Sequence, residues 1–187
     1  MAQKTKGTVG VIGLGIMGGS FAKNLAAAGW RVVGYDLSAA RRREAQAAGV
    51  DVAADAADVA AKTPTIITSL PKPQALIDVA RAIGAAKLKG KTVVEMSTFT
   101  ISDKEKAEKV FTKAGHTMLD CPVSGTGAQA RARDLVFYAS GDTKTIRKLK
   151  PMFEAFGRHV YDVGAFGNGS KMKYVANLLV AINNVAS

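Results

Sequence analysis

Three glycines near the amino terminus have the spacing of a phosphate-binding turn. In the stretch TVGVIGLGIMGGSFA they follow an apolar β-branched run and open an alanine-rich segment with helical periodicity. In a G-x-G-x-x-G turn the first glycine permits the bend, the second lets backbone N–H groups approach a pyrophosphate, and the third allows close packing of helix on strand. The phosphates then lie at the positive end of the helix dipole. The residues of this predicted dinucleotide-binding turn are Gly13, Leu14, Gly15, Ile16, Met17 and Gly18.

Asp36 stands where a dinucleotide-binding site needs an acid. It ends the second apolar run, VVGYD, roughly twenty residues after the glycines. A carboxylate there accepts hydrogen bonds from both hydroxyls of the adenosine ribose and repels a 2′-phosphate, which favours NAD over NADP. Ser38 and Arg41–Arg43 follow within a turn and could bind such a phosphate, although we favour a solvated helix face for the arginines. NAD is therefore the expected cofactor, with NADP as the alternative.

The elements that must position these residues alternate between β-branched apolar runs and alanine-rich amphipathic segments. This alternation predicts an α/β fold with a doubly wound, Rossmann-type, mainly parallel sheet. Runs such as VGVIG and TIITSL are almost continuously apolar, which fits strands buried on both faces. Candidate strands cover residues 8–13, 31–35, 65–70, 92–96, 116–120, 135–139 and 159–162, with a weaker one at 50–53. Candidate helices cover residues 16–28, 39–48, 55–62, 73–84, 102–114 and 142–156.

The pattern changes at residues 116–140. Two candidate strands are separated there by CPVSGTGAQARARD, which contains glycines and no long helical period. A hairpin-like or antiparallel strand is expected in this region.

Composition narrows the classes of partner. The 187 residues carry a formal charge of +11, but the basic groups, such as Lys104, Lys106 and Lys109, are dispersed among acids and small residues, and only 6% of residues are aromatic. This argues against a nucleic-acid surface and favours small anionic ligands. No apolar run is long enough to span a membrane. The single cysteine, Cys121, indicates a reducing cytoplasm, and no ligand spacing for a metal is visible.

The last segment, GNGSKMKYVANLLVAINNVAS at 167–187, reads as one helix with two lysines and an apolar stripe. Lys171 and Lys173 point roughly 200° apart around such a helix, whereas Lys173 and Asn177 are one turn apart on one face. The stripe has no glycine cap at its carboxyl end. It consists of Met172, Val175, Ala176, Leu179, Ile182 and Val185.

Read together with the glycine turn, four further stretches make the chain resemble the β-hydroxyacid dehydrogenase family. The stretches are TSLPKP (68–73), EMSTFT (95–100), DCPVSGTGAQA (120–130) and GNGSKMKYVAN (167–177), in the family's order and over nearly the whole chain. Its members include 3-hydroxyisobutyrate dehydrogenase, tartronate semialdehyde reductase and 6-phosphogluconate dehydrogenase.

The resemblance assigns roles to residues at the strand ends. It implies that Leu70 and Pro71 lie against the nicotinamide half of the cofactor, and that Ser97 and Thr98 lie beside the nicotinamide ribose. Strand carboxyl ends surround the crevice where open α/β sheets bind ligands, so the positions are physically reasonable.

The resemblance also implies a substrate loop and a catalytic pair. Ser124, Gly125 and Thr126 would hold the substrate carboxylate with a hydroxyl and consecutive N–H groups. The family pattern has glycine where Thr126 stands, so the substrate cannot simply be copied from relatives. The family pattern G-x-G-x-x-x-K-x-x-x-N selects Lys173 as general acid and base and Asn177 as its orienting partner, and leaves Lys171 on the surface.

These features predict an NAD(P)-dependent dehydrogenase or reductase that moves a hydride between nicotinamide and a small 3-hydroxy acid or its semialdehyde. Residues 1–164 are expected to form the dinucleotide-binding domain. Residues 165–187 would begin an interdomain helix that in the family leads into a helical, dimer-forming domain. Without it, the chain is expected to bind cofactor but to be weakly active or to self-associate through this helix. A non-catalytic dinucleotide-binding module or inactive fragment, and an imine reductase, are the alternatives.

Overall fold

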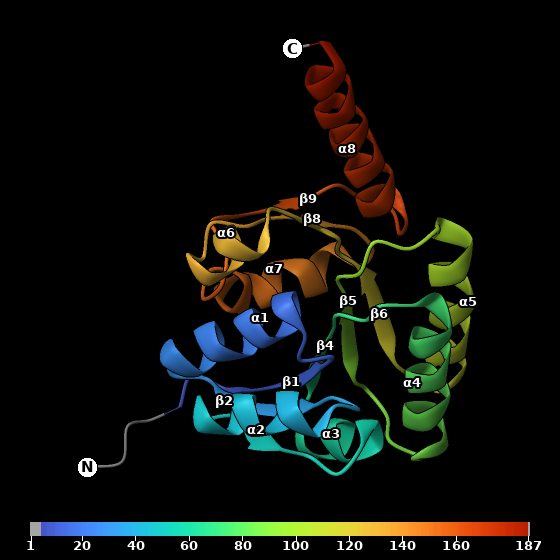
Figure 1. The fold of residues 1–187 in the computed structure, drawn as a ribbon. Coiled ribbons are helices and arrows are strands. Elements are labelled where there is room, and N and C mark those ends of the chain that lie inside the picture. Colours follow the sequence, from blue (N-terminus) through green and yellow to red (C-terminus); the bar gives the residue numbers. More distant parts are fainter. Residues whose placement is uncertain (1–4, 187) are drawn as a thin grey trace.

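Nine strands and eight helices follow one another along residues 5–186, the part of the chain that the computed structural model describes (Figure 1). Strands and helices alternate except where β7 follows β6 directly. Residues 1–4 and 187, which the expected domain limits include, lie outside it. The strands are β1 (Thr8–Ile12), β2 (Arg31–Tyr35), β3 (Asp51–Val52), β4 (Thr65–Thr68), β5 (Thr92–Glu95), β6 (Thr117–Asp120), β7 (Val123–Ser124), β8 (Val136–Ala139) and β9 (His159–Asp162). The helices are α1 (Ile16–Ala27), α2 (Ala39–Ala47), α3 (Ala56–Lys62), α4 (Pro73–Ala85), α5 (Ile101–Lys113), α6 (Gly127–Arg131), α7 (Thr143–Phe153) and α8 (Asn168–Ala186).

The first six strands form one parallel sheet in the order β3-β2-β1-β4-β5-β6. The chain starts at β1 in the middle, winds outward to β3, and then crosses to β4 on the other side, so strands β1 and β4 form the switch point. This confirms the doubly wound, Rossmann-type fold. Strands β1 and β4 end one or two residues earlier than expected, because Gly13 and the residues after Thr68 already turn into loops at the carboxyl edge.

Both faces of this sheet are buried, which is why its strands are almost continuously apolar. On β1, Val9 and Val11 join the core cluster shared with α1, α2 and α7, whereas Ile12 joins the cluster shared with α3, α4 and α5. In the first cluster Phe156 lies 5.1 Å from Phe21 and 4.9 Å from Phe137, between ring centroids. The strand alternation therefore fixes one helical layer on each side.

A second sheet, in the order β7-β8-β9, continues from the edge of the first. Strand β7 is antiparallel to β8, which confirms the antiparallel strand expected near residues 116–140, and β8 is parallel to β9. Asp120, at the end of β6, exchanges two backbone hydrogen bonds of 2.8 and 3.0 Å with Ser140 just after β8. The two sheets thus meet at the end of β6. The short helix α6 inside this region was not expected.

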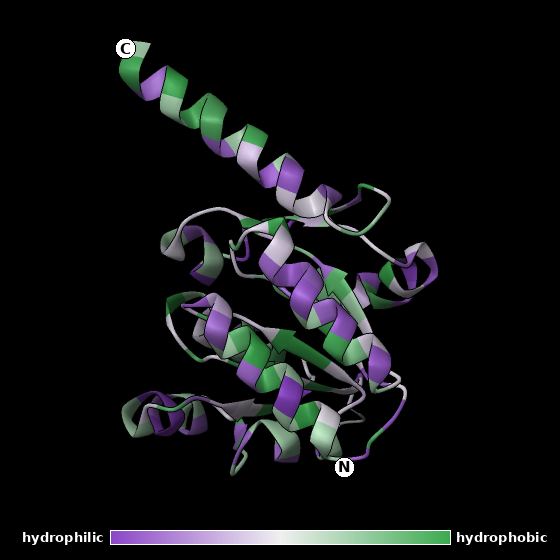
Figure 2. Ribbon diagram, turned by 90° about the vertical axis from the view of Figure 1, so that its right-hand side faces the viewer, coloured by the Kyte–Doolittle hydropathy of each residue, from purple (hydrophilic) through white to green (hydrophobic). Residues whose placement is uncertain are grey.

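Helix α8 projects from the body of the molecule (Figure 1). It begins at Asn168 rather than at residue 165, and only Gly169 and Ser170 of its residues are buried. Green segments along its outer turns in Figure 2 mark apolar residues that remain exposed, among them Leu178, Leu179 and Ile182. Within residues 5–186 no helix combines the length and apolar character that membrane crossing requires.

Candidate active site

The glycine turn joins β1 to α1 at the carboxyl edge of the sheet. Gly13 has φ +90°, and a Cβ there would collide with the carbonyl oxygen of Ser69. A Cβ on Gly18 would collide with the carbonyl oxygen of Gly13, so this contact requires glycine as well. Gly15 is the N-cap of α1; no side chain caps the helix and its first turn has no acidic residue. The amides of that turn are therefore available to an anion.

Asp36 is buried at the end of β2 and is tied to the glycine turn. Its Oδ2 accepts a hydrogen bond of 2.8 Å from the Leu14 amide, and its Oδ1 accepts one of 2.8 Å from the Ser38 amide. Each carboxylate oxygen can accept a further bond, so these contacts orient Asp36 without exhausting it. Asp36 is thus a fixed hydrogen-bond acceptor at the carboxyl end of β2, where its predicted role toward the ribose requires one.

Arg41 lies closer to this site than the expected solvated helix face would place it. Its Nη1 is 3.5 Å from Asp36 Oδ2, and the same nitrogen would lie 3.4 Å from a Cβ on Gly15. Arg42 instead donates to the carbonyl oxygens of Asp36 and Leu37. One arginine therefore faces the glycine turn and partly balances the charge of Asp36.

A cavity of about 450 Å³ opens beside the first turns of α1, between α2 and α6. Its charged lining residues were not predicted as site residues, apart from Arg41 as a candidate for a 2′-phosphate. Lys23 and Glu44 pair with each other at 2.6 Å. The lining also contains two guanidinium groups, that of Arg131 and that of Arg41, which lies beside Asp36. The charged and loop residues of this lining include Gly15, Ile16, Lys23, Arg41, Glu44 and Arg131.

The loops after β4 and β5 lie side by side, as the predicted nicotinamide site requires. The Leu70 amide donates a hydrogen bond of 2.8 Å to Ser97 Oγ. Ser97 is buried, while Pro71 and Thr98 are exposed at the edge. The structure therefore brings together the two strand ends that the sequence assigned to one site.

The predicted substrate loop is partly committed to its own structure. Gly125 has φ +142°, and Ser124 pairs with Val136 on β8. Thr126 is the N-cap of α6: its Oγ1 accepts from the Gln129 amide at 3.3 Å, and its own amide donates to Gln129 Oε1 at 2.9 Å. The expectation that the Thr126 amide is free for a carboxylate is therefore corrected, because the capping box uses it. The Thr126 hydroxyl only accepts in the cap, so its O–H group remains as a donor beside the half-buried Ser124 hydroxyl and the exposed Gly125.

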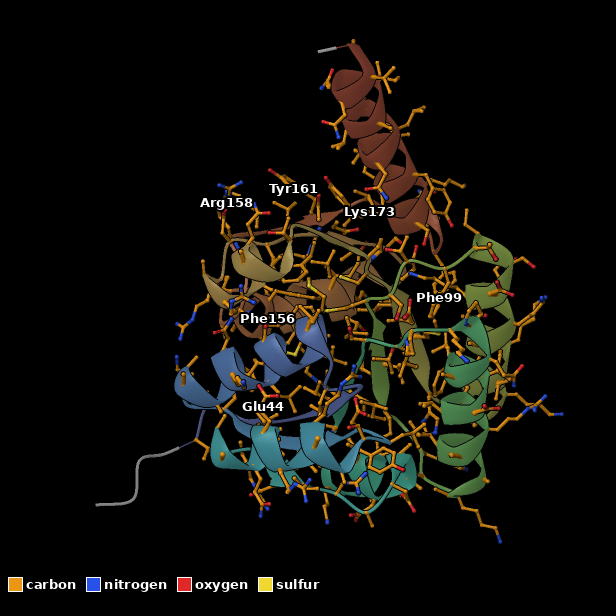
Figure 3. All side chains as sticks on the ribbon, in the orientation of Figure 1. Glu44, Phe99, Phe156, Arg158, Tyr161 and Lys173 are labelled. Carbon is orange, nitrogen blue, oxygen red and sulfur yellow. The ribbon has the colours of Figure 1, made fainter. Side chains whose placement is uncertain are left out.

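Lys173 lies at the base of α8, near the body of the protein (Figure 3). It is half-buried, and this burial lowers the pKa of its ammonium group below the usual 10.5. Asn177 is exposed one turn further along. Lys171 is exposed and lies 3.4 Å from Asn168 Oδ1, as expected for a surface lysine.

The base of α8 is held against the strand ends from two sides. Gly169 packs so closely that a Cβ there would lie 3.0 Å from Pro122, in the stretch that leads to Ser124. On the other side Tyr174 donates a hydrogen bond from its hydroxyl to the carbonyl oxygen of Phe99, directly after Thr98. The first turns of α8, which carry Lys173, are therefore held between the stretch that leads to the substrate loop and the loop after β5.

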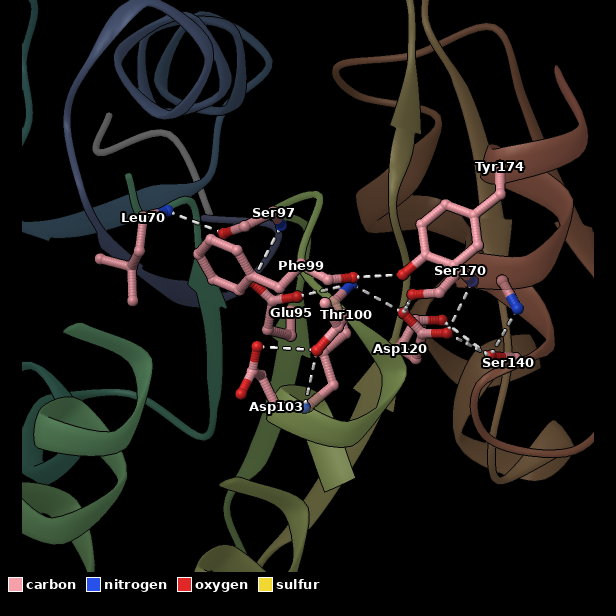
Figure 4. Close-up of polar contacts among 12 residues, drawn as sticks. Leu70, Glu95, Ser97, Phe99, Thr100, Asp103, Asp120, Ser140, Ser170 and Tyr174 are labelled. Carbon is pink, nitrogen blue, oxygen red and sulfur yellow. Dashed lines mark hydrogen bonds and ion pairs between the residues drawn. The ribbon is translucent and has the colours of Figure 1, made fainter. Parts of the chain in front are cut away.

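Sequence reasoning missed a buried charged cluster beneath this site. Lys104 was counted among dispersed charges, yet it is 1% exposed and contacts two fully buried carboxylates, Glu95 and Asp120, both of which are labelled in Figure 4. Two signals were available: both acids end apolar strands, and Lys104 shares the helical spacing of the buried residues Ala107 and Phe111. Cys121 follows Asp120, is fully buried, and has a pKa raised well above its usual value by burial, which fits an inert apolar role.

Comparison with known protein families identifies one matching model. Residues 8–164 match the NAD binding domain of 6-phosphogluconate dehydrogenase. This range contains the glycine turn, Asp36, the strand-end loops and the predicted substrate loop, and it stops before α8.

Individual similar proteins match the chain over α8 as well. The mitochondrial 3-hydroxyisobutyrate dehydrogenase of Mus musculus is 35% identical over 190 residues, covering all of this chain and 56% of that protein. A structure of Mycobacterium tuberculosis 3-hydroxyisobutyrate dehydrogenase with L-serine is 30% identical, with a TM-score of 0.92 over 96% of this chain and 62% of that one. A structure of Psf3 in complex with NADP+ and 2-OPP is 27% identical, with a TM-score of 0.86 over 94% of this chain and 63% of that one.

Proposed function

The chain belongs to the family of NAD-binding domains typified by 6-phosphogluconate dehydrogenase, and on this premise we propose that it is an NAD(P)-dependent oxidoreductase of small 3-hydroxy acids or their semialdehydes. The observation that carries the proposal is the half-buried Lys173, with its lowered pKa, on turns of α8 that pack beside Pro122 and Phe99 in a dinucleotide-binding fold. The cofactor supplies the hydride chemistry, and the chain supplies position and proton transfer.

The residues of the glycine turn fit a dinucleotide. The uncapped first turn of α1 would hold the pyrophosphate, and Asp36, fixed by Leu14, would accept from the adenosine ribose. Leu70 and Ser97 would border the nicotinamide half. We propose NAD as the preferred cofactor because Asp36 would repel a 2′-phosphate. Arg41, 3.5 Å from Asp36, weakens this repulsion, so the preference is expected to be modest.

The substrate carboxylate would bind at Ser124 and Gly125. The Ser124 hydroxyl and the Gly125 amide, which lie outside the capping box, are donors in this loop. The Thr126 hydroxyl is held by the Gln129 amide, from which it accepts, and its O–H group would add a third donor. A short-chain acid is the proposed class of substrate because the helix that carries Lys173 packs at Gly169 on Pro122, two residues before Ser124.

Lys173 would exchange a proton with the substrate oxygen. A lysine acts as a base at neutral pH only when burial or nearby charge lowers its pKa, and burial does so here. In the oxidation direction the neutral amine would take the hydroxyl proton, and in the reduction direction the ammonium would return it. Asn177, on the same face of α8, would orient the substrate or the amine.

The test compares two lysines of one helix. Lys173→Met should leave NADH affinity within a factor of about two while turnover of a 3-hydroxy acid panel falls by about 10²-fold or more, the usual contribution of a general acid or base. Lys171→Met removes an equal charge from the exposed face and should change neither quantity. Equal turnover in the Lys173→Met and wild-type chains would reject Lys173 as the proton-transfer group.

The alternatives give different results in the same assays. The chain spans 56% of the length of the Mus musculus relative. If it binds NADH but turns over no 3-hydroxy acid, semialdehyde or cyclic imine, that result would favour a dinucleotide-binding module or inactive fragment. Reduction of imines alone would favour an imine reductase. We expect hydroxy-acid turnover, because a lysine is suited to proton exchange with a hydroxyl or carbonyl oxygen.

A further inference from the structure

The charged cluster under the site has an unusual composition for a protein interior. The Lys104 ammonium, on α5, lies 2.7 Å from Glu95 Oε2 and 2.8 Å from Asp120 Oδ1, and all three side chains are buried. Figure 4 labels the two acids and the residues bound to them. Ion pairs of this kind are often no more stable than apolar residues of similar size. A gain in stability therefore does not explain why the cluster is present. The groups that the cluster holds in place offer another explanation.

One arm of the cluster reaches the proposed nicotinamide loops. Glu95 Oε1 accepts a hydrogen bond of 2.9 Å from the Ser97 amide. Ser97 Oγ accepts one of 2.8 Å from the Leu70 amide. Glu95 thus fixes the loop after β5, and through Ser97 it fixes the loop after β4 as well.

The other arm reaches the first turn of α8. Asp120 Oδ2 accepts from the Ser170 amide at 2.8 Å, and Oδ1 accepts from Ser170 Oγ at 2.8 Å. Ser140 Oγ lies 3.2 Å from Asp120 Oδ2 and accepts from the Gly169 amide at 3.0 Å. Asp120 therefore serves as the capping anion of the helix that carries Lys173, one turn before it.

Lys104 is the link between these arms. Glu95 and Asp120 face each other across paired strands, in register at the ends of β5 and β6. Two carboxylates in that position repel, and the ammonium group between them turns the repulsion into a bridge. Both arms consist of short bonds to backbone amides, so a displacement of the Ser97 loop is opposed by the anchor of α8.

We propose that Lys104 is a positioning residue that couples the cofactor loops to α8, so that cofactor bound beside Leu70 and Ser97 restrains the turn that presents Lys173. This inference rests on the proposed function, because it takes these loops to border the cofactor. It assigns no chemical step to Lys104, which is sealed beneath the site.

The test measures amide hydrogen exchange of residues 169–175 with and without NADH. In the wild-type chain NADH should slow this exchange by about 5-fold or more, the lower end of ordinary coupling between two sites. The variant Glu95→Gln/Lys104→Met removes one negative and one positive charge, so the net charge of the cluster is kept while the bridge is cut. It should still bind NADH, but the slowing at residues 169–175 should be lost.

A matched control makes the same two changes, Glu to Gln and Lys to Met, at exposed positions of α5. Glu105 and Lys109 are exposed, so Glu105→Gln/Lys109→Met should keep the full NADH effect. If the buried double variant does not fold, Glu95→Gln alone provides the cut. Its amide has one acceptor oxygen where the carboxylate uses two, so the contact with either Lys104 or the Ser97 amide is lost, while one ammonium and one carboxylate remain paired. The slowing should be lost in that variant too.

The outcomes separate the two proposals. If the wild-type chain does not bind NADH, the proposed function is overturned, and the coupling with it. If NADH binds but exchange at residues 169–175 is unchanged in the wild type, or is slowed equally in the cut variant, the coupling alone is overturned. In that case α8 responds to the cofactor directly or not at all.

Discussion

Lys104→Met should destabilise the protein far more than Glu95→Gln, although both substitutions break the same 2.7 Å ion pair. Methionine keeps the apolar stem of Lys104 but leaves two fully buried carboxylates without a cation. Removing one partner of a buried pair costs about 3–5 kcal/mol, and here the remaining carboxylates also repel each other. Glu95→Gln leaves one ammonium paired with one carboxylate, at 2.8 Å, so no uncompensated charge is buried.

The pH dependence of the two chains should differ in a defined direction. Burial raises the pKa of Glu95 above its ordinary 4.5, and Lys104 offsets only part of the rise. The folded state therefore binds this proton more tightly than the unfolded state. The associated stability is fully present below pH 4.5 and is lost as the pH rises through the folded-state pKa of Glu95. Glu95→Gln has no such proton, so its stability relative to wild type should increase with pH, by about 1.4 kcal/mol per unit of raised pKa.

Guanidinium denaturation between pH 5 and 8 measures both effects. The loss in Lys104→Met corresponds to a decrease in Tm of roughly 6–20 °C for a chain of this size. Lys109→Met, exposed on the same helix, should change the free energy of unfolding by no more than about 0.5 kcal/mol. Equal losses in Lys104→Met and Glu95→Gln, or a loss below about 1 kcal/mol in Lys104→Met, would refute the picture of a cluster with one surplus negative charge.

Three further substitutions test the rest of the site. In a fluorescence titration, Gly18→Ala should weaken NADH binding about 10-fold or more, or ~1.4 kcal/mol, because the new Cβ collides with the carbonyl oxygen of Gly13. Gly84→Ala is the control, because a Cβ there meets an ordinary contact of 3.5 Å. Arg41→Ala removes the guanidinium beside Asp36 and should weaken NADPH binding more than NADH binding; equal losses would exclude Arg41 from the cofactor choice. Leu179→Glu places a charge on the exposed apolar face of α8 and should abolish concentration-dependent self-association in sedimentation velocity, whereas a wild-type chain that stays monomeric at every concentration would contradict that interface.

The long elements were predictable because their sequence pattern is local and repeated. Strand β2 matches the predicted limits, α1 ends one residue earlier than predicted, and α5 is shifted by one residue at both ends. Burial on both faces makes a parallel strand apolar at every position, and the flanking helices show a 3.6-residue period, so each signal spans many residues. The glycine turn and Asp36 were also placed correctly at neighbouring strand ends, since the spacing itself encodes the strand, turn and helix.

Short elements lack such a signal. Helix α6 has five residues, too few to show periodicity, and its only local marker is the Thr126 to Gln129 spacing of a capping box. The cap changes the interpretation of the substrate loop, because it consumes the Thr126 amide and fixes the Thr126 hydroxyl as an acceptor. A residue that looks only like an added donor in the sequence therefore also serves as a structural cap in the fold.

Buried charge was the harder case, because burial of Lys104 depends on contacts that no local window contains. Around it the sequence reads DKEKAEK, a typical exposed helix surface. Only the register of β5 with β6 brings Glu95 opposite Asp120, and only the docking of α5 places an ammonium between them. The helical spacing with Ala107 and Phe111 gave a hint, but a lysine on a buried stripe is expected only once two acids are known to face it.

The same network divides α8 into two parts with different supports. Its first turn is held by Asp120 and Ser140, and Gly169 and Ser170 are its only buried residues. From Leu178 onward the helix is exposed and makes no packing contribution to Lys173. The lowered pKa of Lys173 should therefore depend on the anchor and not on the outer turns. Leu179→Glu should leave the pKa of Lys173 unchanged, whereas Glu95→Gln/Lys104→Met should shift it toward 10.5 as the first turns loosen; NMR titration of the labelled ammonium measures both.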